Sequence, residues 1–382
     1  MPDMKTETSA GSGKVGGRRP VLIGSEIYRS STYGSRHPLG IPRVSAALDL
    51  CRSLGWVDEA HYVDSPRATP EELARFHRPD YIAAVMLAEA EQALPPEMAE
   101  RFQIGRFGNP IYPEVFRRPA TACGASIHAA RLLRDGGIVH SMAGGTHHGR
   151  PDRASGFCYF NDPVLAILQM LDDGLERIFY LDLDAHHGDG VQDAFAEDDR
   201  VFTFSIHEAN RWPRTGPVED RAGGFARNAA VPFGLNDSEF EALVREAALP
   251  LMDGFAPDAI VLQCGVDGLM DDPQSRMDLS NSVYWRTVAE VMPRAPRLLV
   301  LGGGGYNPWS VARAWTGIWA TLNGFEVPNR LPEPAQAVLR SLSWRRLGLS
   351  DPPEHWLETL RDPENHGPVR PEIREIIDAI LR

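Results

Sequence analysis

Six short apolar runs, each separated from the next by longer amphipathic stretches, are the feature that most constrains how this 382-residue chain can fold. Because these runs are apolar at successive positions, a strand formed by any of them needs cover on both faces. That requirement is typical of a parallel sheet enclosed by helices. We therefore predict an α/β protein, a three-layer α/β/α sandwich with a central, mainly parallel sheet. The runs span residues 21–24, 138–142, 177–184, 201–206, 259–264 and 298–303.

The intervening stretches carry helix start and stop signals. The segment 161–174 offers Asn161 or Asp162 as N-cap and ends in a glycine, and the segment 42–55 runs from a proline to a glycine. We find no repeat and no linker after residue 20, so we expect a disordered tail over residues 1–20 and one domain over residues 21–382. Further helices are expected over residues 237–255, 280–292 and 309–324.

Composition and charge exclude several classes of protein. A formal net charge of −13 argues against a nucleic-acid partner, but it leaves open a cationic substrate such as a lysine side chain or a polyamine. The chain has 4 cysteines and no CxxC pair, which indicates reduced thiols in a cytoplasmic protein. No apolar run is long enough to span a membrane, and the first residues lack the apolar core of a signal peptide. Oligomeric state is left open.

Polar residues gather at the carboxyl ends of four expected strands. "GGTHHG", "DAHHGDG", "GVDGL" and "GGGGY" each follow one of the apolar runs. The carboxyl ends of parallel strands lie at one edge of a sheet, where ligand sites of α/β proteins form. Together the four ends predict a single polar site there.

The second of these ends has the residues of a metal site. Asp182, Asp184 and His186 alternate along an extended chain and so point one way, while the leucines between them point the other. Aspartate and histidine are ligands of divalent metals, and Asp267 at the next strand end can supply a third ligand. Three protein ligands leave one position open for water, as in a catalytic site. A buried salt-bridge cluster or a set of surface loop acids is the alternative, which the convergence of four strand ends disfavours.

His147 and His148 are either solvated loop residues or a catalytic pair. Asp182 and Asp189 remain available to orient them once Asp184 and Asp267 are assigned to metal. A histidine hydrogen-bonded to a carboxylate has a fixed tautomer and a raised basicity, which a general base requires.

The four glycines before Tyr306 allow three interpretations. A phosphate cradle lacks the lysine and serine of a P-loop. A tight turn would leave the tyrosine exposed. Close approach of the backbone to a substrate would instead place the Tyr306 hydroxyl where it can donate a hydrogen bond to an oxyanion.

The aromatic segment "GFCYFND" (156–162) is either ordinary core or one wall of a narrow tunnel. In the second interpretation Phe157 faces Trp212 across a channel that accepts a slim aliphatic chain.

The motifs "GGTHHG", "GFCYFND", "YLDLDAHHGDGVQDAF", "QCGVDGLMDDP" and "LGGGGYNP" resemble, in order and spacing, the zinc-dependent histone deacetylase superfamily of the arginase/deacetylase fold. The resemblance covers about residues 21 to 325 and is greatest to bacterial histone deacetylase-like amidohydrolases and acetoin-utilisation deacetylases.

The resemblance implies roles for individual residues. His148 is implied as general base and acid, with Asp189 behind it, and His147 as an electrostatic support, with Asp182 behind it. Tyr306 is implied to polarise the carbonyl. The implied ligands of one catalytic zinc are Asp184, His186 and Asp267. The implied structural potassium site uses main-chain oxygens of Asp182, Asp184, His186, Ser205 and Ile206. The implied substrate-contacting residues are Arg43, in a pocket behind the metal, with Gly156, Phe157, Trp212, Gln274 and Gly304.

Three positions depart from the family's pattern. Gly108 or Asn109 stands where many eukaryotic members have a rim acid. Gln274 replaces a common apolar rim residue, or the glutamate of polyamine-preferring members, and Trp212 replaces a phenylalanine. The substrate is thus left open between acyl-lysine of proteins and a small acylated amine.

We therefore interpret the chain as a zinc amidohydrolase that removes an acetyl or related acyl group from an amine. An arginase-like manganese enzyme would need a second carboxylate-rich metal position. A catalytically inactive scaffold is disfavoured because every catalytic position is filled. A dinucleotide-binding enzyme is excluded because the glycines at positions 11, 13 and 16 precede the first strand.

Overall fold

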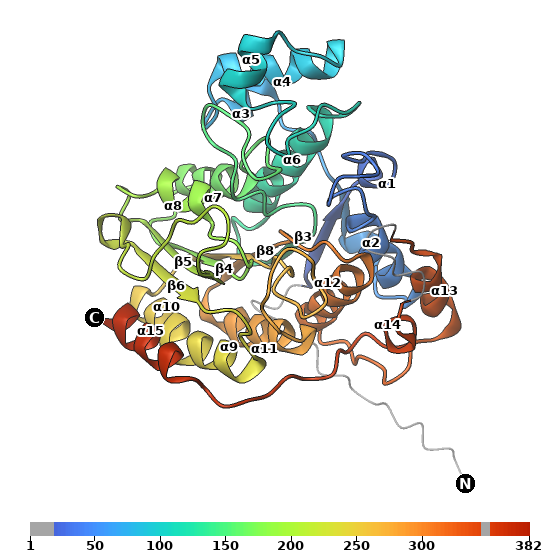
Figure 1. The fold of residues 1–382 in the computed structure, drawn as a ribbon, viewed down its shortest axis with the longest axis vertical. Helices are drawn as coiled ribbons and strands as arrows, with labels where there is room; N and C mark the ends of the chain where they lie inside the picture. The colour runs from blue at the N-terminus through green and yellow to red at the C-terminus, as the bar shows by residue number, and fades with distance from the viewer. Residues whose placement is uncertain (1–18, 345–351) are drawn as a thin grey trace.

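The computed structural model describes residues 19–344 and 352–382. Its centre is an eight-stranded sheet in the order β2-β1-β3-β8-β7-β4-β5-β6, and every pair of neighbours is parallel. The predicted sandwich is confirmed, with a sheet that is parallel throughout (Figure 1). The strands are β1 (Val21–Gly24), β2 (Tyr62–Asp64), β3 (Gly137–Ser141), β4 (Ile178–Asp182), β5 (Val201–Glu208), β6 (Ala226–Val231), β7 (Ala259–Gln263) and β8 (Arg297–Leu301).

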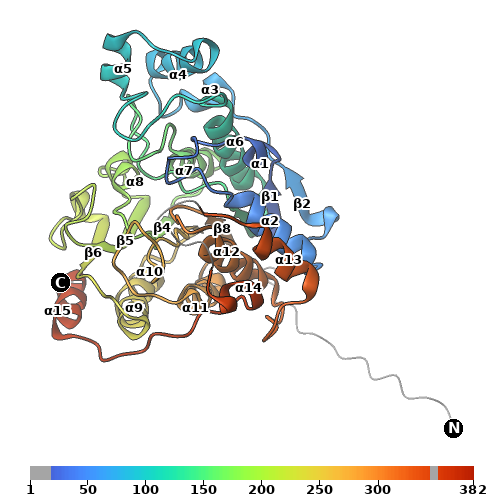
Figure 2. The ribbon, with the colours of Figure 1, turned by 45° about the vertical axis from the view of Figure 1, so that its right-hand side comes forward.

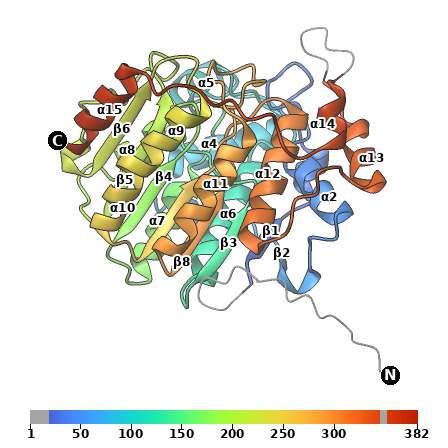
Figure 3. The same ribbon diagram turned by 90° about the horizontal axis from the view of Figure 1, so that it is seen from below.

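Both faces of the sheet are covered, as continuous apolar strands require. In β4, Phe179 and Leu181 pack into one cluster of buried side chains, and Ile178 and Tyr180 into another on the opposite face. One face carries α6 (Arg117–Leu132), α7 (Asp162–Asp172) and α8 (Asp189–Ala194) (Figure 1). The other carries α2 (Val44–Ser53), α9 (Asp237–Leu243), α10 (Leu249–Phe255), α11 (Asn281–Val291) and α12 (Pro308–Asn323), seen from below in Figure 3.

A lobe of short helices stands above the α6 side of the sheet (Figure 2). Its apolar residues form a third cluster, which includes Tyr81 and Phe102 and reaches Tyr306 and Phe157. This lobe therefore supports one wall of the site described below. Its helices are α3 (Pro70–Leu73), α4 (Pro79–Glu91) and α5 (Pro96–Phe102). The remaining helices are α1 (Ile27–Ser30), α13 (Glu333–Ser341), α14 (Glu354–Glu358) and α15 (Pro371–Leu381).

The helix expected over residues 237–255 is interrupted. A π turn, Val244–Ala248, separates α9 from α10. Pro250 explains the break, because it has no amide hydrogen and its ring crowds the carbonyl of Glu246, four residues before it and inside the turn.

Two strands and several helices were absent from the sequence-based expectations, and α6 is the longest of these helices. β2 and β6 lie at the two edges of the sheet, and α6 packs against α7. β6 reads ARNAAV and β2 has 3 residues, so neither shows the apolar run by which the central strands were found. Of the tail expected over residues 1–20, positions 1–18 lie outside the described residues, and the single-domain expectation stays a prediction. No helix in the described parts of the chain is long and apolar enough to cross a membrane.

Candidate active site

The four polar strand ends meet, as expected. The strands that precede them, β3, β8, β7 and β4, are consecutive neighbours in the sheet, so their carboxyl ends form one continuous edge. Segments far apart in the sequence thereby deliver their polar side chains to the same place.

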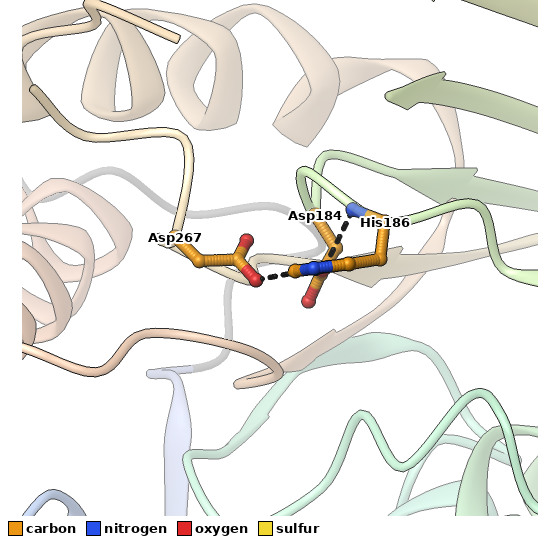
Figure 4. Close-up of side chains that lie close together, drawn as sticks. All are labelled: Asp184, His186 and Asp267. Carbon is orange, nitrogen blue, oxygen red and sulfur yellow. Dashed lines mark hydrogen bonds and ion pairs between the residues drawn. The ribbon is translucent and has the colours of Figure 1, made fainter. Parts of the chain in front are cut away.

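Asp184, His186 and Asp267 form a cluster at this edge (Figure 4). Their candidate ligand atoms lie within 4.8 Å of one another. The Nδ1 atom of His186 is 2.8 Å from Oδ2 of Asp267 and 3.1 Å from Oδ1 of Asp184. Within residues 19–344 and 352–382, this is the only group of at least three histidine, cysteine or acidic residues close enough together to hold a metal ion.

Backbone amides fix the orientation of both carboxylates. The Gly304 N–H donates to Oδ2 of Asp184 at 2.7 Å, and the Ala185 N–H donates to Oδ1 of Asp267 at 2.8 Å. A Cβ on residue 304 would lie 2.2 Å from Asp267, so only glycine permits this approach. Such outer contacts hold ligands in place for a metal.

The two buried carboxylates of the cluster favour binding of a cation. Asp184 and Asp267 are 1% and 0% exposed. Burial raises the pKa of Asp184, but the charges of His147 and His186 outweigh it and hold that pKa well below its ordinary value. Burial and the charge of Asp184 raise the pKa of Asp267. Two buried carboxylates that oppose each other's ionisation are relieved by a divalent ion, so the donor set fits zinc.

His147 and His148 each pair with the carboxylate that the family resemblance implied. Nδ1 of His147 donates to Oδ2 of Asp182 at 2.7 Å, and Nδ1 of His148 donates to Oδ1 of Asp189 at 2.7 Å. All four side chains are buried, so the interpretation of the histidines as solvated loop residues is wrong. A carboxylate accepts only, so the hydrogen sits on Nδ1 and Nε2 of a neutral ring is left to take a proton.

The two histidines differ in their ionisation. Burial lowers the pKa of His147, but the charges of Asp182 and Asp184 outweigh it and raise that pKa to about 9. Burial and the charge of His147 lower the pKa of His148 to about 4, against the opposing effect of Asp189. The two imidazoles, with ring centroids 3.9 Å apart, therefore differ in basicity, and His147 is the stronger base.

Tyr306 is 8% exposed, so the interpretation of an exposed turn tyrosine is wrong. Its backbone N–H donates to Oδ2 of Asp272 at 2.6 Å, which fixes the start of the segment before α12. The Tyr306 hydroxyl has no hydrogen-bond partner in the described part of the chain. Burial and the charges of Asp267 and Asp184 raise its pKa well above the ordinary value, so the hydroxyl keeps its proton.

A pocket of about 200 Å³, called the tunnel below, lies beside these groups. Phe157 lies in contact with Tyr306, and Trp212 packs edge-on against His148 with ring centroids 4.6 Å apart. Gly156 packs against the ring of Trp212. The residues lining the tunnel are Phe107, His148, Gly156, Phe157, His186, Trp212, Gln274 and Tyr306.

At Gly108, one of the two candidate positions for a rim acid, the structure leaves no room for a side chain. Gly108 has φ +82°, and a Cβ there would lie 2.6 Å from the Phe157 ring. Phe157 itself has φ 68°, a left-handed conformation that is unfavourable for a bulky residue. The Asn109 side chain holds it there by accepting the Phe157 N–H at 2.9 Å.

Arg43 and Gly304 line a second, inner cavity of about 60 Å³ next to Asp184. Nη1 of Arg43 donates to the carbonyl of Gly303 at 2.6 Å, which ties the arginine to the glycine segment. Arg43 thus shares this cavity with Asp184, and its expected place behind a bound metal and its role with substrate stay predictions.

The positions implied for potassium are adjacent in the sheet. Asp182 on β4 pairs in register with Ser205 on β5, and Ile206 follows it, with both side chains buried. The site itself stays a prediction.

Three side chains near the candidate catalytic groups were not among the residues predicted from the sequence. The Gln263 amide donates to Oδ2 of Asp184 at 3.1 Å, and the Tyr180 hydroxyl donates to Oδ2 of Asp182 at 2.7 Å. Gln263 was detectable as a polar residue inside the apolar run of β7. Phe107 lines the tunnel while 71% exposed, and nothing in the sequence pattern marks it.

Comparison with known proteins agrees with this geometry. The histone deacetylase domain family matches residues 37–322. The acetoin utilization protein AcuC of Bacillus subtilis is 33% identical over 82% of this chain and 85% of its own. The crystal structure of an HDAC homolog from Aquifex aeolicus has a TM-score of 0.89 and 36% identity, covering 96% of this chain and all of that one. An HDAC homolog complexed with SAHA matches with the same TM-score, 0.89, and 37% identity over 96% of this chain and 100% of that one.

The chain therefore belongs to the histone deacetylase family. The predicted superfamily, its bacterial relatives and the predicted enzyme class, a deacetylase, are confirmed.

Proposed function

We propose that this protein is a zinc-dependent amidohydrolase that removes the acetyl or a related acyl group from a lysine side chain or a small amine. One observation carries the proposal. Two histidine–aspartate pairs and three metal-type ligands lie next to one tunnel, and His148, His186 and Tyr306 line it. Amide hydrolysis needs this set: an electrophile, a general base, an oxyanion donor and a channel that admits an aliphatic chain.

The proposed steps follow from the groups in the tunnel. Zinc at Asp184, His186 and Asp267 would polarise the acyl carbonyl and lower the pKa of a water molecule. His148, neutral at pH 7, takes the proton of the attacking water through Nε2. The Tyr306 hydroxyl donates to the oxyanion, and the charge of His147 supports it. His148 then returns the proton to the leaving amine.

The tunnel residues set what enters. Phe157 and Trp212 leave a channel of about 200 Å³, below the roughly 300–1,000 Å³ of a pocket that encloses a drug-sized ligand. A linear side chain such as acyl-lysine fits this description. We also propose that potassium is held by the main chain at the β4–β5 pair, as the family resemblance implies.

An arginase-like reaction is less consistent with the site. A binuclear centre needs further acids beside the first metal position, and the described residues offer one ligand group only. Asp182 and Asp189, the other acids nearby, are hydrogen-bonded to His147 and His148.

Turnover across a matched panel tests the proposal. We expect release of acetate or a longer carboxylate from at least one of acetyl-lysine peptides, acetylpolyamines and longer acyl-lysines, measured beside zinc content on one sample. Chelation should stop the reaction and zinc should restore it. A zinc-replete protein that hydrolyses none of these amides contradicts the proposal and favours a binding protein.

The ionisation of His148 predicts an unusual pH profile. Its base form is lost only as pH falls through about 4, well below the 6.5 of an ordinary histidine. A bound cation shifts this pKa further down, because it repels the imidazolium. We therefore expect kcat/KM to stay level from about pH 8 down to about pH 5, in samples whose zinc content is checked at each pH.

Asp189→Asn provides the matched variant for this profile. Asp189 raises the pKa of His148. Its loss should therefore shift the acid limb of the pH profile to lower pH and make His148 a weaker general base. If the acid limb lies near pH 6.5 and does not shift in the Asp189→Asn variant, a group other than His148 titrates.

A further inference from the structure

A broad groove opens beside the tunnel mouth, and we call it the arginine groove. Its volume is about 870 Å³, and His186, Trp212 and Gln274 line both it and the tunnel. An acyl-lysine seated in the tunnel would therefore have neighbouring parts of its molecule at the groove. The groove takes its name from three of its lining residues, Arg211, Arg214 and Arg276.

Arg211 is engaged within the protein. It donates to both carboxylate oxygens of Glu208, at 2.6 and 2.9 Å, and to the carbonyl of Gln274 at 2.6 Å. Glu208 is 7% exposed, and its ion pair with Arg211 carries no net charge. The bond from Arg211 holds the backbone of Gln274 at the tunnel mouth. Because Glu208 is paired with Arg211, it offers no free carboxylate to a ligand in the groove.

Arg214 and Arg276 are different. Both are exposed, and within residues 19–344 and 352–382 neither guanidinium has a hydrogen bond or an ion pair. Arg214 has φ 65°, a conformation that glycine adopts freely and a long side chain adopts at a cost. The chain thus has a long, charged side chain at a position whose backbone conformation favours glycine. Glu372, exposed in the first turn of α15, is the other charged group at the groove.

The cations on the other side of the mouth are already neutralised. Arg150 contacts Asp189 and Asp193, and Arg153 lies 2.9 Å from Asp152. Both arginines line a smaller pocket, of about 380 Å³, that shares Phe107, Gly156 and Trp212 with the tunnel. Among the arginines that line the pockets around the tunnel, the two without a partner in the described residues thus both line the arginine groove, in a chain whose formal net charge is −13.

We propose that the arginine groove binds an acidic segment of an acylated peptide, with Arg214 and Arg276 contacting carboxylates next to the acyl-lysine in the tunnel. This inference rests on the proposed function and selects its substrate class. The volume leaves room for flanking residues, and Phe233, 68% exposed, offers them an apolar surface. An acylpolyamine would bring further positive charge to two unpaired guanidinium groups, which disfavours it.

The test compares acetyl-lysine peptides flanked on both sides by Asp, by Ala or by Lys, together with capped acetyl-lysine, which has no flanks. For the zinc enzyme at low salt we expect kcat/KM for the Asp peptide to exceed that for the Ala peptide by about 3–10-fold, the effect of two exposed ion pairs. The Lys peptide should be the poorest. The preference should disappear at 1 M salt, where the Debye length is about 3 Å.

Variants locate the effect. In the Arg214→Gly/Arg276→Ala variant the kcat/KM values of the three peptides should agree within about 2-fold. Turnover of capped acetyl-lysine should be unchanged. Glycine at position 214 keeps the left-handed backbone without strain. Arg153→Ala, across the mouth, is the matched control and should keep the preference. Equal turnover of Asp and Lys peptides, or a preference that survives the double substitution, overturns the proposal.

A binding measurement separates this proposal from the proposed function. In dye-labelled peptides a methyl ketone, which cannot be hydrolysed, replaces the acetyl amide, and fluorescence anisotropy gives their affinity. Tighter binding of the Asp peptide without turnover of any amide supports the groove and overturns the proposed function. Turnover without any difference in affinity supports the proposed function and overturns the groove.

Discussion

Asp267→Ala is expected to remove both bound zinc and deacylation. The substitution deletes one of three ligands, and it leaves Asp184 and His186 without the carboxylate that faces Nδ1 of the imidazole at 2.8 Å. A metal that polarises a carbonyl supplies several kcal/mol of transition-state stabilisation, so activity should fall by at least about 10³-fold. Zinc per chain, measured after gel filtration, should fall together with kcat.

Asp271→Ala is the matched control for this loss. Asp271 is an exposed acid four residues further along the same loop and outside the ligand group, so its removal should leave zinc and turnover near wild type. Circular dichroism on both variants separates loss of metal from loss of fold. An Asp267→Ala protein with wild-type turnover contradicts the ligand assignment.

Tyr306→Phe is expected to lower kcat by about 10²–10³-fold, as does loss of an oxyanion-hole donor. The substitution deletes one hydroxyl that has no partner within the described residues and keeps the ring that packs against Phe157. Folding, zinc content and KM should therefore change little. Because the hydroxyl acts in the transition state, the loss should be in kcat.

Tyr62→Phe, in the edge strand β2, is the control and should be neutral. The measurement is kcat, KM and zinc stoichiometry on one purified sample of each variant. Near-normal turnover by a zinc-replete Tyr306→Phe protein would mean that the metal polarises the carbonyl unaided and that Tyr306 is only a packing residue.

Local pattern was enough to predict the core of the fold. The central strands are short apolar runs because both of their faces are buried, and burial leaves a direct trace in composition. The alternation expected over Asp182, Asp184 and His186 requires an extended chain, but β4 ends at Asp182 and the other two residues lie in the bend that follows. Edge strands such as β6 are covered less completely and carry no such trace.

The partners of the catalytic residues needed more than local pattern. Asp267 lies 81 residues from His186 in sequence, and only the neighbouring positions of β4 and β7 bring them within 2.8 Å. The pairings of His147 with Asp182 and of His148 with Asp189 followed from family resemblance, and the structure has both. Gln263 contacts Asp184 through the same strand pairing. It is a polar residue within an apolar run, which marks it in the sequence.

The sequence by itself determined the fold class and marked the polar strand ends that hold Asp184, His186, the histidine pair and Tyr306, because each of these segments is encoded in residue type and short-range spacing. Only the tertiary structure decided which groups around the mouth are neutralised and which are free. Arg211 and Arg214 are three residues apart and chemically identical, yet Glu208 engages one and no described residue engages the other. Ion pairing depends on where loops fold back over the surface, and loop paths depend on contacts distant in sequence.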